Sequence, residues 1–267
     1  MSQSILVEEA GGVLRLTIDR QPRLNAIDLA AMTELGDLIR AAADRPSVRV
    51  IVLTGAGTAF CTGADLAAAA AAGGNEAAPQ VVMDSANAVI QAIIASPLPV
   101  IARVNGPAAG IGASIALAAD LVYAADSAYL LPFTSIGLMP DGGATAVVAA
   151  AMGRAKAAEM ALLGARLPAA DAAAAGLITG CVPATELDDL VDSVAARLAA
   201  GPRRALQLTK AAINAATLTE LDAALAREKD GQIELLTSAD FLEGMTAMLT
   251  RRAPNFTGAV HPVAEPA

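Results

Sequence analysis

The chain alternates short apolar runs of β-forming residues with longer segments whose apolar side chains recur at helical intervals. Runs of the first kind occupy residues 48–55, 100–104 and 121–125, with helical periodicity between them. Alternation of strand and helix favours parallel strands joined by helical crossovers, with ligands bound where strands end and loops begin. The sequence therefore predicts an α/β fold, with its chemistry in the loops that follow the strands.

The beginning of the chain departs from this alternation and predicts a β-hairpin. Residues 4–19 read as two alternating strands around Gly11 and Gly12, a pair that tolerates the positive φ angles of a tight turn. A helix follows, because Asp28 stands where an N-cap is expected and the next apolar residues recur at helical intervals. We therefore expect one antiparallel hairpin before the parallel strands.

The second half of the sequence differs from the first. Residues 142–252 carry patterns that are almost wholly helical, interrupted by short segments that contain Gly and Pro. We therefore expect a core over residues 1–200 that holds the ligand site. Residues 201–267 are expected to form a C-terminal helical region that ends in a flexible tail.

Composition narrows the classes of partner. With 267 residues, of which 55% are hydrophobic, the chain is long enough to bury a large core. A formal net charge of −9 disfavours a nucleic-acid partner, because such binding depends on clustered Lys and Arg. No segment reaches the ~18 or more strongly apolar residues of a membrane span, and the first residues include two acids and no basic leader. We expect a cytoplasmic protein that binds neither nucleic acid nor membrane.

Scarce residue types exclude several kinds of active site. The single histidine, His261, lies in a Pro- and Ala-rich tail, and the two cysteines, Cys61 and Cys181, are far apart. Ser-His triads, Cys-His dyads and ordinary zinc sites therefore lack their components, and we expect no metal. Any chemistry must rest on carboxylates, hydroxyls, Lys or Arg, and main-chain amides.

Two glycine-containing stretches follow predicted strands and share one layout. They span residues 54–66, TGAGTAFCTGADL, and residues 104–114, VNGPAAGIGAS. Glycine lets the main chain turn tightly and approach a ligand, so that free amides at a turn or helix start can face an oxygen. An α/β protein also uses glycine after a strand merely to turn, and one such loop alone would favour that interpretation. The two loops together indicate a site for an oxyanion.

Four segments in a fixed order carry a resemblance to a known family. FCTGADL, NGPAAGIG, IGLMPDGG and RRAPNFTG, with the opening IDRQPRLNAI, resemble the crotonase, or enoyl-CoA hydratase/isomerase, superfamily over residues 5–258. The resemblance implies a spiral of repeated ββα units, a C-terminal helical region used in assembly, and a homotrimer or a dimer of trimers. It also implies an acyl-CoA thioester substrate, with no cofactor beyond the coenzyme A of that substrate.

The resemblance further implies where the substrate is held. The oxyanion hole is expected at the main-chain amides of Ala64 and Ile111, because an enolate formed beside a thioester places negative charge on the carbonyl oxygen. Arg23 is expected to face the CoA phosphates, although its charge also suits a solvated loop. The main chain around Ala64, Asp65 and Leu66 is expected to contact the adenine or pantetheine end. Asp65 also suits the N-cap of a following helix.

Two acids of the family's hydratases are replaced in this chain. Those enzymes hold the acyl chain between two glutamates, and the corresponding positions here are Ser114 and Phe133. Addition of water requires one group to activate the water and one to deliver a proton, so this replacement disfavours hydration. Ser114 is a poor base without a histidine, and the favoured explanation is a helix-face hydroxyl bonded to a preceding carbonyl.

One acid remains in this neighbourhood, Asp141 in the segment GLMPDGG. The family's isomerases resemble the chain in carrying an acid there, and a double-bond shift needs one base that lifts a proton and returns it to another carbon. Its apolar neighbours, Phe133, Leu138 and Met139, are expected to exclude water and raise the carboxyl pKa. The alternative is that Asp141 caps a helix starting at Gly142. The sequence favours an enoyl-CoA isomerase, with a hydratase or a CoA-binding protein without turnover as alternatives.

Overall fold

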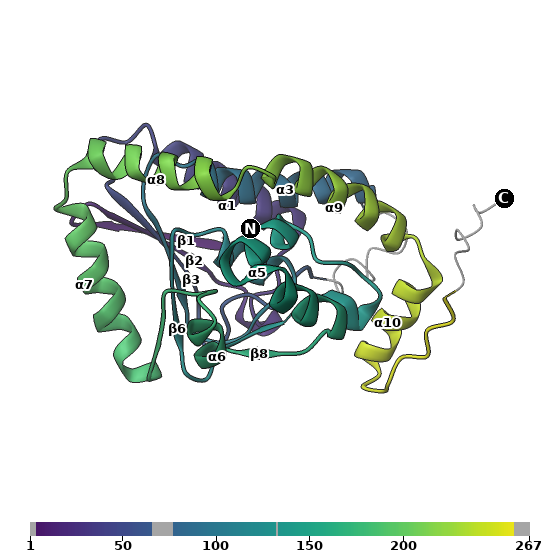
Figure 1. The fold of residues 1–267 in the computed structure, drawn as a ribbon. Coiled ribbons are helices and arrows are strands. Elements are labelled where there is room, and N and C mark those ends of the chain that lie inside the picture. The colour runs from purple at the N-terminus through teal and green to yellow at the C-terminus, as the bar shows by residue number, and fades with distance from the viewer. Residues whose placement is uncertain (1–3, 66–76, 132, 259–267) are drawn as a thin grey trace.

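The large sheet of the molecule is built from the strands that the sequence predicts. The structure is a computed structural model that describes residues 4–65, 77–131 and 133–258. Its six strands, in the order β1-β2-β3-β4-β6-β9, are β1 (Ile5–Ala10), β2 (Val13–Ile18), β3 (Val50–Gly55), β4 (Val100–Val104), β6 (Leu121–Ala125) and β9 (Gly180–Val182). Strands β1 and β2 pair antiparallel and the other neighbours are parallel (Figure 1). The predicted hairpin and parallel strands are therefore confirmed.

A second sheet of three strands completes the repeated unit. Its strands, in the order β5-β7-β8, are β5 (Ala108–Ala109), β7 (Tyr129–Leu131) and β8 (Leu167–Pro168). From β4 the chain enters β5 and then helix α4 (Ile111–Leu117). From β6 it enters β7, the 3-10 turn η2 (Phe133–Ile136) and helix α5 (Ala144–Leu163). Each unit adds one strand to each sheet before its helix, which is the expected spiral of ββα units.

The second half of the chain is less uniformly helical than its sequence indicates. Strands β8 and β9 lie at the short Gly- and Pro-containing segments that interrupt the helical pattern, and β9 forms the edge of the large sheet beside β6. These strands are two and three residues long, too short for alternation to show in the sequence. The expectation of almost wholly helical structure over residues 142–252 therefore holds outside these interruptions, and the two strands within them were not predicted.

Helices cover both faces of the large sheet. Besides α4 and α5, the helices and 3-10 turns before residue 200 are η1 (Gln21–Arg23), α1 (Leu29–Ala42), α3 (Pro79–Ala95), α6 (Ala169–Ala174), η3 (Ala184–Glu186) and α7 (Leu187–Ala199). In strand β3, Ile51 and Leu53 join the core shared with α1 and α3. Val50 and Val52 pack with residues of α7 in a separate cluster. Helix α7 lies on the other side of the sheet from α1 and α3 (Figure 1). Burial of both faces is typical of parallel sheets.

Three helices follow, and two of them pack against α3. They are α8 (Arg203–Thr217), α9 (Leu221–Leu236) and α10 (Ala239–Leu249). Helix α8 is tied to α3 by Lys210, whose Nζ donates to Ile93 O at 3.0 Å, and α9 packs between α3 and α5. Helix α10 lies against η2 at the end of the molecule away from α7 (Figure 1). No helix within the described ranges is long and apolar enough to cross a membrane.

Two expectations about the C-terminal part of the chain are not settled by these helices. The division at residue 200 falls between α7 and α8 and stays a prediction, as does the assembly into a trimer or a dimer of trimers. The expected flexible tail includes residues 259–267, and these residues, with His261, lie outside the described part of the chain.

Candidate active site

The first glycine loop ends in a short extended segment that pairs with the loop before α1. The amide of Ile27 donates to Gly63 O at 2.8 Å, and the amide of Asp65 donates back to Ile27 O at 3.0 Å. In such parallel pairing, alternate residues direct their amides to opposite sides of the segment. The Ala64 amide therefore points away from Ile27, and it donates to no residue in the described part of the chain.

The second glycine loop places the start of a helix against this segment. Gly110 adopts φ 53° and ψ −135°, and α4 begins at the next residue. The Ile111 amide therefore lies in the first turn of the helix, where it has no partner within the helix. Gly112 lies so close to Cys61 that a Cβ atom at position 112 would be 2.2 Å from the Cys61 carbonyl oxygen. A side chain at position 112 would push the two loops apart.

These contacts bring the two predicted amides together. The amide of Ala109 donates to Cys61 O at 2.9 Å, and a Cβ atom at Gly63 would lie 3.2 Å from Ala109 O. The amides of Ala64 and Ile111 follow directly on these contacts, and neither donates to another residue within the described ranges. The two amides thus lie on adjoining segments, and their joint role as an oxyanion hole stays a prediction.

Asp141 lies in the turn before α5 and is 5% exposed. Its Oδ2 accepts a hydrogen bond from Nε2 of Gln232 at 2.7 Å, while its buried Oδ1 has no hydrogen-bond partner among the described residues. Burial raises the pKa of Asp141 to about 7, although the Gln232 hydrogen bond opposes the rise and the negative charge of Glu228 adds to it. The expected direction of the pKa is confirmed.

The structure corrects the favoured explanation of Ser114 and the capping alternative for Asp141. Ser114 Oγ donates to the main-chain carbonyl of Asp141 at 2.7 Å, not to a preceding carbonyl of its own helix. Helix α5 begins at Ala144, because Gly142 and Gly143 both adopt positive φ angles, of 64° and 77°, which delay the helix. The side chain of Asp141 does not cap α5.

A carboxylate from α9 takes the place of the missing cap. Glu228 is 1% exposed, and its two oxygens accept from the amides of Gly143 at 2.6 Å and Thr145 at 2.8 Å. Negative charge is favourable at a helix start, although burial raises the pKa of Glu228. One turn further on, Gln232 Oε1 accepts from the amide of Met139 at 3.1 Å. Sequence analysis missed both side chains, and the signal was two polar residues, four apart, on the buried face of a helix.

A small cavity opens between α4 and α5 beside this turn. Its volume is about 50 Å³, and its lining is mostly apolar, with Gly110, Ser114, Pro140 and Met160 among the residues that form it. Gly110 and Pro140 are the immediate neighbours of Ile111 and Asp141. The cavity therefore lies next to the segments that carry the Ile111 amide and Asp141.

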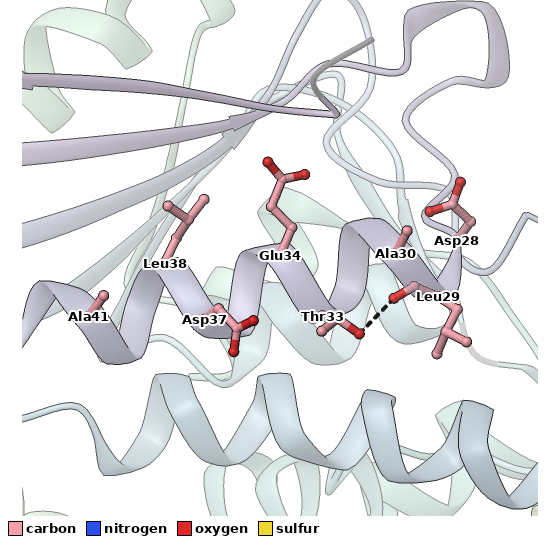
Figure 2. Close-up of a pocket in the computed structure, with 8 residues that line it drawn as sticks. All are labelled: Asp28, Leu29, Ala30, Thr33, Glu34, Asp37, Leu38 and Ala41. Carbon is pink, nitrogen blue, oxygen red and sulfur yellow. Dashed lines mark hydrogen bonds between the residues drawn. The ribbon is translucent and has the colours of Figure 1, made fainter. Parts of the chain in front are cut away.

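A larger hollow, of about 980 Å³, lies along α1 (Figure 2). Its lining residues are Asp28, Leu29, Ala30, Thr33, Glu34, Asp37, Leu38 and Ala41, all from α1 or its N-cap. Three of these residues are acids, whose charge repels phosphates. Because neither glycine loop contributes to the hollow, we place the candidate site at the smaller cavity.

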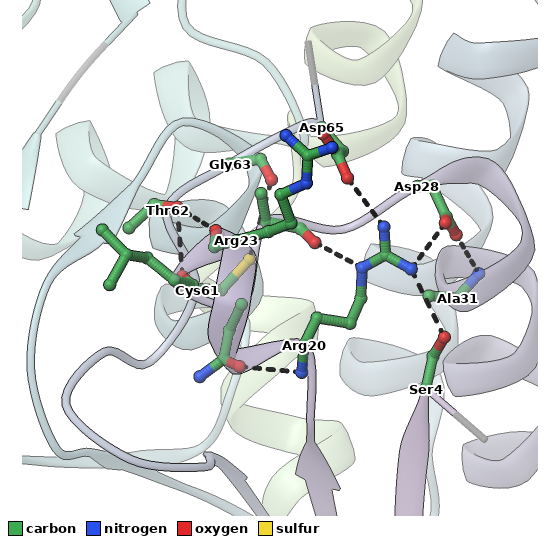
Figure 3. A network of polar contacts seen from close by, with 12 residues as sticks. Ser4, Arg20, Arg23, Asp28, Ala31, Cys61, Thr62, Gly63 and Asp65 are labelled. Atoms are coloured by element: carbon green, nitrogen blue, oxygen red, sulfur yellow. Dashed lines mark hydrogen bonds and ion pairs between the residues drawn. The ribbon is translucent and has the colours of Figure 1, made fainter. Parts of the chain in front are cut away.

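Arg20 lies in the loop between β2 and α1, and its side chain connects this loop to the first glycine loop (Figure 3). Its Nη2 pairs with Asp65 Oδ2 at 2.7 Å, its Nη1 pairs with Asp28 Oδ2 at 2.6 Å, and its Nε donates to a main-chain carbonyl in the same loop. Asp28 also accepts from the amide of Ala31 at 2.9 Å, which confirms the predicted N-cap of α1. Sequence analysis did not select Arg20, although two acids near the loops required a cation.

The residues expected to contact CoA lie on these same loops. Arg23 is exposed at the end of η1, and its guanidinium forms no ion pair within the described ranges. Thr62 Oγ1 donates to Leu24 O at 3.1 Å, so this turn lies against the first glycine loop. Asp65 is 8% exposed and its carboxylate is held by the arginine described above. Leu66, with the segment that Asp65 would cap, lies outside the described residues.

Comparison with known proteins assigns the family. The sequence model of the family described as enoyl-CoA hydratase/isomerase matches residues 8–259. The chain belongs to the enoyl-CoA hydratase/isomerase family. Its spiral of ββα units and its two glycine loops are therefore features of an enzyme that acts on CoA thioesters.

Similar members of the enoyl-CoA hydratase/isomerase family span nearly the whole chain. A probable enoyl-CoA hydratase of Rhodobacter capsulatus is 44% identical over 96% of this chain and 98% of its own. A 1,2-epoxyphenylacetyl-CoA isomerase of Escherichia coli is 38% identical over 97% of this chain and 100% of its own. The crystal structure of an enoyl-CoA hydratase from Mycobacterium avium subsp. paratuberculosis matches with a TM-score of 0.88 and 49% identity, over 96% and 99% of the two chains. Two of these names are of hydratases and one is of an isomerase of an epoxide, so the reaction must be argued from the site.

Proposed function

We propose that this member of the family is an enoyl-CoA isomerase that shifts a C=C bond of its substrate. The observation that carries the proposal is Asp141, a buried carboxyl with a pKa of about 7, one oxygen of which has no partner among the described residues. The turn that bears Asp141 packs against the first residue of α4, since a Cβ atom at Gly142 would lie 2.9 Å from Ile111 Cδ1. A group with a pKa near the ambient pH both accepts and donates a proton efficiently, and a double-bond shift needs one such group.

The proposed reaction uses the main chain and the carboxylate in turn. The thioester carbonyl oxygen accepts hydrogen bonds from the amides of Ala64 and Ile111. Asp141 removes a proton from C2 or C4, and negative charge moves onto that oxygen as a dienolate, which the two amides stabilise. Asp141 then returns the proton to the other carbon. The double bond has moved, and the carboxylate is regenerated.

Coenzyme A takes part as a portion of the substrate. Arg23 is proposed to face its phosphates, and the exposed guanidinium on η1 supports this role. The main chain at Ala64, Asp65 and Leu66 is proposed to meet the adenine or pantetheine end. The cavity of about 50 Å³ is proposed to receive the acyl group, because its lining is mostly apolar.

A hydratase is the second candidate, because two of the similar proteins carry that name. Hydration needs one group for the water and one for the proton at C2. The hydroxyl of Ser114 donates to the Asp141 carbonyl, and both carboxylate oxygens of Glu228 accept main-chain amides. The second glutamate position is Phe133, whose side chain lies outside the described residues but whose phenyl group transfers no proton. These assignments favour the reaction that one acid can perform.

The test is product analysis with 2-enoyl- and 3-enoyl-CoA thioesters. Wild-type protein is expected to interconvert the two, and Asp141→Asn is expected to lower kcat by roughly 10²–10⁴ because the proton carrier is lost. Binding of CoA should persist in this variant, as measured by calorimetry. Asp230→Asn is the matched control, since Asp230 is exposed on α9 and the same charge is removed.

Three outcomes would contradict the isomerase. Rapid hydration of 2-enoyl-CoA by the wild type would establish the second candidate. CoA binding without turnover of either substrate would indicate a binding protein. Isomerisation by Asp141→Asn at the wild-type rate would show that another acid carries the proton.

A further inference from the structure

Gln232 spans the turn that carries the acid. Its Oε1 accepts from the main-chain amide of Met139 at 3.1 Å, and its Nε2 donates to Oδ2 of Asp141 at 2.7 Å. The two ends of a side-chain amide have nearly the same shape, so a structure alone leaves their assignment open. Here the assignment is forced, because an amide N–H of the main chain can only donate. Oε1 must face Met139, and Nε2 must therefore face Asp141.

This orientation makes the two oxygens of Asp141 unequal. The Nε2 group of Gln232 has hydrogen atoms to donate and no lone pair to offer, so Oδ2 accepts in either protonation state. Because a carbonyl oxygen is a better acceptor than an acid hydroxyl, this hydrogen bond favours the proton of Asp141 on Oδ1. That oxygen is the buried atom without a partner among the described residues. The hydrogen bond thus leaves one oxygen for proton transfer.

The other polar groups around Asp141 do not compete for Oδ1. Ser114, from α4, donates to the main-chain carbonyl of Asp141, and Glu228, from α9, accepts the amides at the start of α5. Within the described residues, Glu228 is the charged group whose field acts on the carboxyl, and Arg227 acts in turn on Glu228. Gln232 is therefore the side chain that distinguishes Oδ1 from Oδ2.

We propose that Gln232 is a positioning residue, which holds Oδ2 of Asp141 so that the substrate proton is taken up and returned at Oδ1. The inference rests on the proposed isomerase function. In each turnover, the C–H bond at one carbon breaks as the Oδ1–H bond forms, and the reverse occurs at the other carbon. The carboxylate ends as it began, and no further reactant is consumed.

The first experiment titrates Asp141 directly and needs no turnover. Full-length protein with ¹³C-labelled aspartate carboxyls is followed by NMR, and Asp141→Asn identifies the signal. Gln232→Met should raise the pKa of Asp141 by roughly one unit, because the carboxylate loses one hydrogen bond to its charged form. Glu228→Gln should lower it, because a negative neighbour is removed. Asp230→Asn, on the exposed face of α9, should leave it unchanged.

A second variant guards against failure to fold. Gln232→Glu keeps the shape of the side chain and retains an oxygen for Met139, while its second oxygen faces Oδ2 of Asp141. Two carboxyls that share one proton titrate in two steps, and the second step lies above the pKa of either carboxyl alone, so the final ionisation at Asp141 should again move upward. Absence of an upward shift in whichever of the two variants folds would overturn the inference.

The kinetic experiment separates this inference from the proposed function. At pH 7, Gln232→Met should lower kcat by roughly fivefold through the smaller fraction of carboxylate, and the acidic limb of the pH profile should move to higher pH with the titration. CoA affinity should not change. If the pKa of Asp141 shifts in Gln232→Met but the wild-type protein isomerises neither substrate, the positioning role of Gln232 is supported and the proposed isomerase function is wrong. If wild type isomerises through Asp141 and Gln232→Met leaves both pKa and pH profile unchanged, the isomerase stands and positioning is wrong.

Discussion

The candidate site has two walls that are made by different means. The main-chain wall consists of residues 61–64 and 110–112, and it presents the amides of Ala64 and Ile111. The side-chain wall consists of the turn at 139–145 together with α9, and it presents a carboxyl held by other side chains. The first is fixed by close contact between backbones, and the second by hydrogen bonds across a helix.

The difference between the walls matches the two tasks of the proposed isomerisation. In the main-chain wall, burial raises the pKa of Cys61 to about 12, so the charge of this wall is constant at physiological pH. In the side-chain wall, burial raises the pKa of both Asp141 and Glu228. In the proposed reaction, the thioester carbonyl oxygen becomes negative and needs hydrogen-bond donors whose charge does not change. The carbon that loses a proton needs a base whose charge changes when it takes up that proton. Backbone amides suit the first task and a buried acid the second.

The largest expected effect is a stability difference that arises in the side-chain wall alone. Folding raises the pKa of Asp141 from 3.8 to about 7, so the native state binds more protons than the unfolded state between these values. Wild-type stability contributed by this group is therefore present below pH 4 and lost as pH rises through 7. Asp141→Asn removes the dependence, and its stability relative to wild type should rise by on the order of 4 kcal/mol from pH 4 to pH 8. Urea unfolding of both proteins at pH 4 and pH 8 measures this change. The prediction is contradicted if the difference in unfolding free energy between Asp141→Asn and wild type is the same at both pH values.

The next effect concerns the main-chain wall, where space is the constraint. Gly112→Ala would place a methyl group 2.2 Å from Cys61 O, so the two loops must separate. We expect a loss of about 1–3 kcal/mol of unfolding free energy. We also expect a loss of roughly 10² in kcat/KM, because the Ile111 amide is displaced. Gly180→Ala is the control, since its nearest contact would be the Tyr123 ring at 3.4 Å. If Gly112→Ala keeps the stability and activity of the wild type, the close contact between Gly112 and Cys61 does not fix the main-chain wall.

A smaller effect is expected where the two walls meet. Ser114→Ala removes the hydrogen bond from α4 to the Asp141 carbonyl and should lower the unfolding free energy by about 1 kcal/mol. The pH profile of isomerisation should keep its position, because the hydroxyl bonds the main chain and not the carboxyl. Abolished activity in this folded variant would instead identify Ser114 as a proton carrier.

The smallest effect is expected outside both walls, at the proposed CoA phosphates. Arg23→Ala should weaken binding of acetyl-CoA by several-fold at low salt, and the loss should shrink as ionic strength rises. Calorimetry at two salt concentrations measures it, with Arg204→Ala on α8 as the control for an exposed arginine elsewhere. Unchanged affinity in Arg23→Ala would remove this residue from the site.

The sequence predicted those parts of the molecule whose signals are local. Strands at 48–55, 100–104 and 121–125 are recognisable from their composition. The glycine patterns indicated two loops, and the resemblance to the family selected the amides of Ala64 and Ile111 within them. Strands β8 and β9 were missed because two or three residues carry no periodicity.

Sequence analysis missed the residues that hold Asp141 for a different reason. Gln232 lies 91 residues after Asp141, and no local pattern states which turn a polar residue on a distant helix will face. The start of α5 was misplaced because Gly142 and Gly143 permit two conformations that the sequence does not distinguish. Tertiary packing against α9 decides both, and this information is absent from each segment taken alone.

Because Asp141 is held by a residue of α9, the parts of the site are also synthesised at different times. The last residue of the main-chain wall is Gly112, and Gln232 follows it by 120 residues. At a synthesis rate of about 5–20 residues per second, roughly 6 to 24 s separate the emergence of these two positions from the ribosome. Throughout that interval the growing chain carries the amide pair without the side chain that makes the two oxygens of the acid unequal. The site is completed late in synthesis, when α9 docks.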